Sequence, residues 1–195
     1  MDMTIFTDAV ARYSAPLRAT DRATAALLQT ISTRKVAKGE HLFRQGDTAQ
    51  ALYFVTAGLL RYYYLADGVE HTGQFFNEGM FVADVAALTT GSPGLQNIDA
   101  LEAAEVLVIP RAALFAAYDA DQAYERFGRR IMEEVVAGSQ RRSASLLMLS
   151  PEERYERFLA ARPQVARRVP QYTIASYLGI TPEALSRIRR RRATS

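Results

Sequence analysis

The chain has 195 residues, of which 49% are hydrophobic and 23% charged, a composition typical of a soluble globular protein with one large or two small domains. It has no Cys and only two His, His41 and His71, which excludes disulfides and thiol catalysis and disfavours a His-rich metal site. The sequence has no run of roughly 20 apolar residues and no signal-peptide pattern at its start. We therefore expect a cytoplasmic protein with no membrane segment and no cofactor.

The formal net charge of +3 is unevenly distributed along the chain. From residue 149 to residue 195 there are ten Arg against four Glu, a formal charge of +6. The remaining residues carry 14 basic and 17 acidic side chains, a formal charge of −3. Such asymmetry indicates a nucleic-acid-binding end joined to a domain with a different task.

The first two thirds of the chain change from helical to β-rich patterns. Residues 1–32 have apolar side chains at roughly helical spacing and are predicted to form a helical lead-in. From residue 34 to residue 109, short β-rich runs alternate with turn signals, and Asp67-Gly68 is typical of a two-residue hairpin turn. Many short strands at this spacing favour a sandwich or barrel.

A long helix is predicted over residues 124–149, after a short one over residues 111–118. Most of an apolar line runs along the long helix, although Arg141 and Arg142 interrupt it. The line consists of Phe127, Ile131, Val135, Gly138, Leu146 and Leu149. Such a helix either packs on its own β-rich domain or pairs with the same helix of a second copy.

A strong helix start follows this long helix. Ser150 is a predicted N-cap, Pro151 fits the first helical position, and Glu153 completes a capping box. We therefore divide the chain into three predicted parts, which are residues 1–123, 124–149 and 150–195.

The stretch from residue 172 to residue 192 is predicted to form two short helices joined by a tight turn. The first helix has apolar residues at helical spacing and ends at Gly179, which suits a left-handed turn. Thr181 is the predicted N-cap of the second helix, and Pro182 is its first residue. Two such helices occur in many bundles, and a run of charge is often only a solvated face. A second helix with a buried stripe and an Arg-rich outer face can also enter a DNA major groove.

Two regions together resemble the Crp/Fnr superfamily of bacterial transcription regulators. The stretch IASYLGITPEALSRIRR resembles the helix–turn–helix of that family, and the β-rich region resembles its cyclic-nucleotide-binding β-roll. The second resemblance rests on the segments 38–40, 43–47, 52–55 with Gly58, 67–68 and 106–111. It implies an α+β fold with an N-terminal β-roll of the jelly-roll type, a long dimerisation helix, and a C-terminal helix–turn–helix domain with a shortened or absent wing.

The resemblance also implies roles for residues of the helix pair. Base edges are expected to be contacted by Glu183, Ser186 and Arg187, since Arg can donate to guanine and Glu can accept from cytosine. Phosphates are expected to be contacted by Tyr172, Thr173, Thr181, Arg189, Arg190, Arg191 and Arg192. Further phosphate candidates, each of which could instead be solvated surface, are Arg154, Arg157, Arg162, Arg167 and Arg168.

The partners implied are double-stranded DNA, a second copy of the chain and RNA polymerase. The family pairs through its long helix, so we favour the dimer for residues 124–149. Two recognition helices on a two-fold axis can read an inverted repeat.

The β-roll departs from the family pattern at the effector pocket. The family carries Gly-Glu in a short helix and an Arg about ten residues later, whereas this chain has Ala83-Asp84 and no Lys or Arg from residue 62 to residue 110. Burying a cyclic phosphate without a cationic partner is costly. We therefore expect that cyclic AMP does not bind in the usual way. The candidate effector pocket consists of Tyr62, Tyr64, Phe81, Ala83, Asp84, Leu95 and Gln96, and its effector is left open.

Three alternatives remain from the sequence. The leading hypothesis is a homodimeric DNA-binding regulator with a degenerate effector domain. The second is a regulator that responds to a cyclic nucleotide through an altered pocket. The third is a β-roll interaction module that binds an acidic protein rather than DNA. We find no nucleophile with a plausible base, no metal spacing and no phosphate loop, so we expect no enzyme activity.

Overall fold

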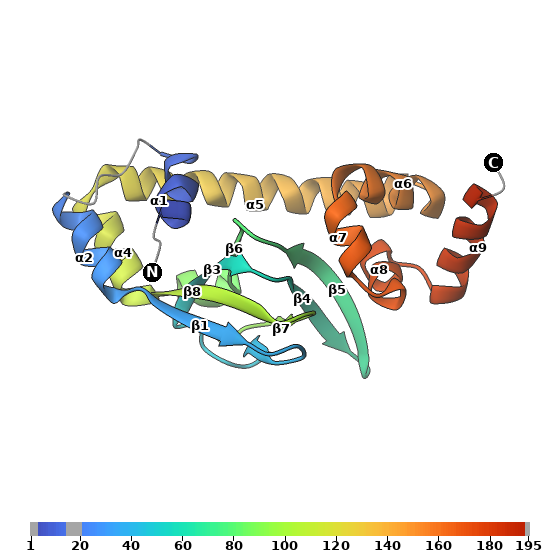
Figure 1. The fold of residues 1–195 in the computed structure, drawn as a ribbon, viewed down its shortest axis with the longest axis horizontal. Coiled ribbons are helices and arrows are strands. Elements are labelled where there is room, and N and C mark those ends of the chain that lie inside the picture. The colour runs from blue at the N-terminus through green and yellow to red at the C-terminus, as the bar shows by residue number, and fades with distance from the viewer. Residues whose placement is uncertain (1–3, 15–20, 194–195) are drawn as a thin grey trace.

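The computed structural model describes residues 4–14 and 21–193. Residues 1–3 and 15–20 of the predicted helical lead-in lie outside the described residues. The rest of that lead-in contains the helices α1 (Thr4–Ala11) and α2 (Arg22–Thr30). The described part is elongated, with a β-roll beside one long helix and a group of short helices at the far end (Figure 1).

Two antiparallel four-stranded sheets form the β-roll, in the orders β1-β8-β3-β6 and β2-β7-β4-β5. The strands are β1 (Ser32–Val36), β2 (His41–Phe43), β3 (Ala51–Ala57), β4 (Leu60–Ala66), β5 (Val69–Phe76), β6 (Phe81–Val82), β7 (Asn97–Ala100) and β8 (Ala104–Pro110). The predicted turn joins β4 to β5, and Asp67 and Gly68 have φ values of 52° and 76°, as a type I′ turn requires. The predicted β-rich domain is confirmed.

An aromatic cluster joins the β-roll to the helices that close one end of it. The ring of Phe81 lies 4.8 Å from that of Phe54 and 5.1 Å from that of Phe127, measured between centroids. Phe6 of α1 meets Phe54 edge-to-face at 6.0 Å. Figure 1 shows α1, α2 and α4 (Arg111–Ala120) gathered around the beginning of α5. Burial of these rings therefore fixes α5 against the β-roll.

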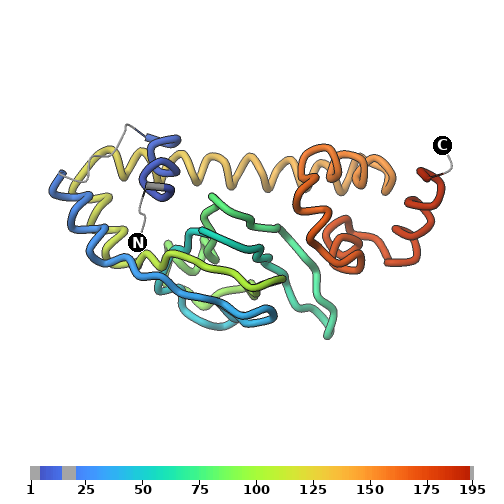
Figure 2. Tube along the Cα trace, in the orientation of Figure 1, coloured from blue at the N-terminus to red at the C-terminus, as the bar shows by residue number. Residues whose placement is uncertain are grey.

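The helix α5 (Gln122–Met148) has 27 residues and runs along most of the length of the molecule (Figure 2). At 1.5 Å per residue it spans about 40 Å. The N-cap side chain of Asp121 accepts a hydrogen bond from the backbone N–H of Ala123. None of the described helices combines the length and the apolar character needed to cross a membrane.

The apolar line predicted along α5 faces two directions, which corrects its use as a single dimer seam. Phe127 is 1% exposed and lies in the core of its own chain, and Ile131 packs against that core. Of the other members, Val135 and Leu146 are exposed, and Gly138 and Leu149 are half-buried. One face of α5 covers its own β-roll and cannot also meet a partner. The exposed apolar side chains of α5 are Val135, Val136, Leu146, Leu147 and Met148.

A second helical unit follows α5 and has its own core. Its helices are α6 (Pro151–Ala161), α7 (Pro163–Arg168), α8 (Gln171–Leu178) and α9 (Pro182–Ala193). The predicted capping box is present, because Ser150 Oγ accepts from the Glu153 N–H and the Glu153 carboxylate accepts from the Ser150 N–H. The core of this unit also includes Leu59 and Phe75 of the β-roll.

Candidate nucleic-acid interface and effector pocket

The helices α8 and α9 form a helix–turn–helix whose turn follows from the local sequence. Gly179 has a φ of 67° and ends α8. The Ala184 N–H donates to Thr181 Oγ1 at 3.2 Å, so Thr181 caps α9 as predicted. Buried Leu185 and Ile188 hold α9 on the core of the unit. The opposite face of α9 is thereby directed outward.

The three predicted base-contacting residues, Glu183, Ser186 and Arg187, are all exposed on α9. Together with Pro182 and Arg190 they form one open surface of α9. A hydrogen bond from its own backbone N–H and one from the Thr181 hydroxyl lower the pKa of Glu183, so its carboxylate is an acceptor at neutral pH. The structure therefore places a bidentate donor and an ionised acceptor on one accessible face.

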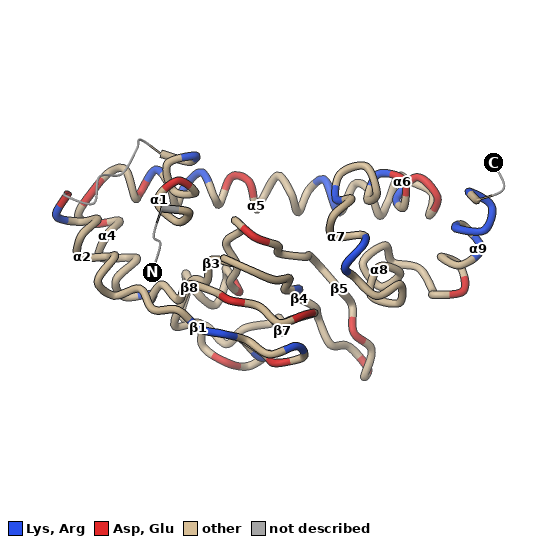
Figure 3. The backbone as a smooth tube through the Cα atoms, viewed as in Figure 1, with Lys and Arg blue, Asp and Glu red and all other residues tan. Residues whose placement is uncertain are grey.

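Most of the predicted phosphate-contacting residues are exposed, but one is not. Tyr172, Thr181 and Arg189 through Arg192 lie on the surface, and basic residues cover the C-terminal part of α9 (Figure 3). Arg191 also contacts the Glu152 carboxylate at 3.3 Å. Thr173 is 0% exposed, which corrects the prediction that its side chain contacts phosphate. It begins the buried stripe of α8 and packs toward the core.

Three of the five further Arg candidates point into the protein rather than toward solvent. Arg154 donates to the carbonyl of Leu149 at the end of α5. Arg162 and Arg168 donate to acceptors of the β-roll, as described below. These three guanidinium groups are occupied by the fold, so their assignment as phosphate contacts is corrected. Arg157 and Arg167 are exposed.

Of the predicted effector-pocket residues, Tyr62, Tyr64 and Gln96 lie together beside β4, whereas the Leu95 side chain is 67% exposed. Tyr64 Oη accepts from Gln96 Nε2 at 3.2 Å, and the Tyr62 and Tyr64 rings are 5.6 Å apart. Burial raises the pKa of Tyr62 to about 12, so its phenol is neutral. Phe81 lies apart from this group, because its ring belongs to the aromatic cluster with Phe54 and Phe127.

Asp84 joins the start of a short helix to the loop that contains Leu95 and Gln96. It precedes the short helix α3 (Val85–Thr90) and is only 2% exposed. Its carboxylate accepts backbone hydrogen bonds from Ala87 at 3.0 Å, Leu95 at 2.9 Å and Gln96 at 3.2 Å. Three backbone amides donate to the Asp84 carboxylate, so the protein itself supplies the negative charge beside these amides. Ala83, beside it, is buried.

Gly94 shows how little space remains beside the Asp84 carboxylate. A Cβ at position 94 would lie 2.3 Å from the Phe43 ring and 3.0 Å from Asp84 Oδ2. A longer side chain at position 94 therefore cannot be accommodated without displacing Phe43. The space at position 94 is thus too small for a long basic side chain, and the sequence has no Lys or Arg from residue 62 to residue 110.

Comparisons with known proteins agree with this architecture. Residues 33–121 match the family model of the cyclic nucleotide-binding domain. The transcriptional activator protein FnrA of Stutzerimonas stutzeri is 30% identical over 166 residues, which cover 80% of this chain and 68% of that protein. The chain belongs to the Crp/Fnr family of transcription regulators.

Solved structures show the same fold. FixK2 from Bradyrhizobium japonicum superposes with a TM-score of 0.75 at 22% identity, over 85% of each chain. The c-di-GMP responsive global regulator CLP of Xanthomonas campestris gives a TM-score of 0.71 at 18% identity, over 88% of this chain and 91% of that one. The predicted fold of β-roll, long helix and terminal helical unit is confirmed.

Proposed function

We propose that this chain regulates transcription by placing α9 in the major groove of double-stranded DNA. The observation that carries the proposal is the exposed face of α9, where Glu183, Ser186 and Arg187 lie side by side. A guanidinium donates two hydrogen bonds to O6 and N7 of guanine, and an ionised carboxylate accepts from N4 of cytosine. The Arg residues near the end of α9 supply positive charge for the phosphates.

We propose further that two copies pair through the outer face of α5. Val136 and Leu147 are 55% and 86% exposed in the single chain and lie about three helical turns apart on this face. Exposed apolar side chains in a row along a helix are typical of a helix–helix interface. A two-fold dimer would present two α9 helices to half-sites about one helical turn of DNA apart.

The β-roll, in this proposal, does not bind cyclic AMP in the usual way. The buried Asp84 carboxylate occupies three backbone amides, and residues 62–110 contain no Lys or Arg. A phosphate entering beside this carboxylate would meet like charge in a poorly solvated place. The match of residues 33–121 to the cyclic nucleotide-binding domain supports a second candidate, a regulator that responds to such a ligand through an altered pocket.

The experiment that tests DNA recognition is selection of bound sites from a random DNA pool with the full chain. We expect an inverted repeat whose two halves are equivalent, and binding that weakens steeply as salt rises because counterions are released. A pool without enrichment, together with binding that hardly depends on salt, would refute the proposal and favour a protein-interaction module. Selection of a single, asymmetric half-site would refute only the dimer.

A further inference from the structure

The helix–turn–helix unit is docked on the β-roll of its own chain through an apolar contact. Phe75 of β5 is fully buried, and its ring lies 5.0 Å from that of Tyr177 in α8 and 6.0 Å from that of Phe158 in α6. The helix α5 connects to α6 through residues 149–150 alone. The unit therefore follows α5 after a short connection and packs its aromatic side chains against β5.

The strand that receives the unit is the edge of its sheet, and side chains from the helices satisfy its backbone. Ser176 Oγ accepts from the Thr72 N–H at 2.9 Å and donates to the Glu70 carbonyl at 2.8 Å. Arg142 Nη2 of α5 donates to the Thr72 carbonyl at 3.1 Å and to the Tyr177 carbonyl at 2.8 Å. Unpaired edge groups are costly when water is excluded, so these bonds fix α8 in register with β5.

Arg162 adds a second polar contact at the junction of α6 and α7. Its guanidinium donates to the Phe75 carbonyl at 2.8 Å, to Gln74 Oε1 at 3.1 Å and to Asn77 Oδ1 at 3.2 Å. These acceptors are neutral, and burial lowers the pKa of Arg162. Arg162 therefore holds the helical unit against the β-roll through these hydrogen bonds.

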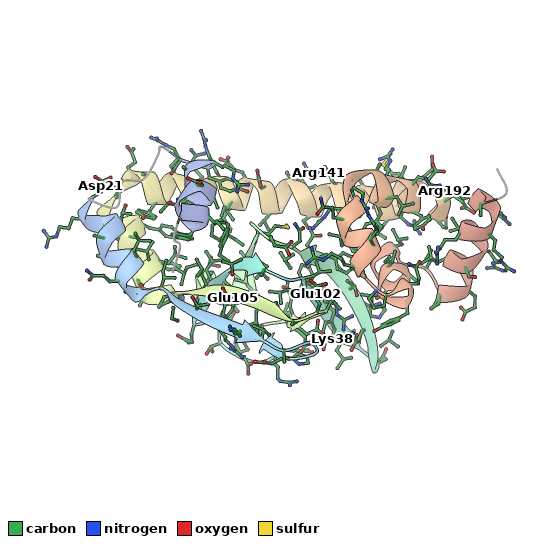
Figure 4. The ribbon with its side chains drawn as sticks, viewed as in Figure 1. Asp21, Lys38, Glu102, Glu105, Arg141 and Arg192 are labelled. Carbon is green, nitrogen blue, oxygen red and sulfur yellow. The ribbon has the colours of Figure 1, made fainter. Side chains whose placement is uncertain are left out.

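Arg168 at the end of α7 makes the charged part of the interface. It donates to both carboxylate oxygens of Glu78, at 2.8 and 3.0 Å, and to both of Glu102, at 2.5 and 3.3 Å. These hydrogen bonds lower the pKa of Glu78 to about 2 and raise that of Arg168. Glu102, labelled in Figure 4, belongs to the β-roll. We refer to Arg168, Glu78 and Glu102 as the latch.

The docked position leaves the proposed DNA-reading face of α9 accessible. Figure 1 shows α9 at the end of the molecule farthest from α2 and α4, with α8 between it and β5. Glu183, Ser186 and Arg187 are exposed while the latch is closed. A closed latch therefore does not block the proposed reading face.

We propose that Arg168 is a positioning residue, whose bonds to Glu78 and Glu102 hold α9 in its DNA-competent place without an effector. The proposal rests on the proposed DNA-binding function. A helical unit that pivots freely occupies the competent position for only a fraction of the time, and its apparent affinity falls by that fraction. The latch raises this fraction through contacts within the chain. In this protein the Asp84 carboxylate supplies the negative charge that accepts from the Leu95 and Gln96 amides. The latch supplies the restraint on the DNA-binding unit. Both therefore come from the chain itself.

The first test compares Arg168→Glu with Arg22→Glu in the full chain. Both variants change the charge equally, but Arg22 is exposed at the start of α2, and α2 lies at the opposite end of the molecule from α9 (Figure 1). We expect Arg168→Glu to bind the selected DNA site about tenfold more weakly than Arg22→Glu. Small-angle scattering should show a larger radius of gyration for Arg168→Glu alone. Arg168→Gln serves as the milder variant should Arg168→Glu unfold.

The second test joins positions 78 and 168 of the latch by a covalent cross-link. Because the chain has no Cys, a Glu78→Cys, Arg168→Cys double variant carries two unique thiols. We expect weak DNA binding before reaction with a short bis-maleimide and recovered binding after it. Loss of binding on cross-linking would overturn the proposal, because the docked state would then be the inhibited one.

The outcomes separate this inference from the proposed function. If the wild-type chain selects no DNA, the proposed function fails, and scattering still reports whether the latch restrains the helical unit. If the wild-type chain selects a site and the Arg168 and Arg22 variants behave alike in affinity and scattering, the latch is refuted and DNA recognition stands.

Discussion

Arg187→Ala is the substitution that tests the reading face of α9 most directly. Arg187 is exposed, and it lies four residues after Glu183 on the same helix face. Substitution of an exposed side chain without a buried contact changes stability little, so the variant should fold and melt nearly as the wild type does. A lost bidentate contact to guanine costs about 1–3 kcal/mol in each half-site, which is roughly a 5- to 150-fold loss of affinity per half-site.

The assay for Arg187→Ala is a gel shift on the selected site, repeated on sites altered at each position. We expect the variant to lose discrimination at one base pair in each half-site. Arg22→Ala is the matched control, because it removes the same charge from an exposed place in α2, outside the helical unit. An Arg187→Ala protein with unchanged affinity and unchanged base preference would refute the assignment of α9 as the reading helix.

Three further predictions concern the dimer face, the pocket and the latch. Val136→Glu should give monomers in sedimentation with an unchanged single-chain fold, since Val136 is 55% exposed; a dimer that persists would contradict pairing through this face. Millimolar cyclic AMP should leave the melting temperature of the wild-type chain unchanged, whereas a saturable rise at micromolar concentration would favour the altered-pocket regulator. Ionised Glu78 stabilises the fold above its unfolded pKa near 4.5, and this contribution is lost as pH falls toward about 2. The stability gap between wild type and Glu78→Gln should therefore narrow below pH about 4.5, and a gap that widens in acid would contradict the latch geometry.

The helix–turn–helix was predictable because its signals are local. The turn at Gly179, the cap at Thr181 and the buried positions of α9 all depend on residues within a few positions of one another. The hairpin at Asp67-Gly68 was predictable for the same reason. Local backbone chemistry decides these features whatever the rest of the chain does.

The orientation of α5 was harder to predict because both of its faces carry apolar residues. Phe127 and Val135 both belong to the apolar line predicted from the sequence, but Phe127 meets the Phe81 ring of the β-roll while Val135 remains exposed. Which face meets the β-roll depends on contacts between segments far apart in sequence. The apolar line predicted from sequence therefore mixed residues of the two faces.

The departure at the effector pocket was predicted from a missing basic residue, and the structure adds the hydrogen bonds of Asp84. The missing basic residue was visible in the sequence. The hydrogen bonds of Asp84 to Leu95 and Gln96 were not, since they depend on the loop between α3 and β7 folding back onto the start of α3. A short acidic side chain at a helix start is more often only an N-cap, and Asp84 also has that role.

The Arg-rich composition of the last part of the chain overstates the charge available to DNA. Three of its ten Arg, namely Arg154, Arg162 and Arg168, donate to carbonyls, amide oxygens or carboxylates inside the protein. The partners of Arg168 lie 90 and 66 residues earlier in the sequence, so no local pattern distinguishes it from its exposed neighbour Arg167. What distinguishes the two is burial beside carboxylates of the β-roll. The charge proposed to meet DNA is therefore concentrated on α9, whereas Arg162 and Arg168 donate to the β-roll.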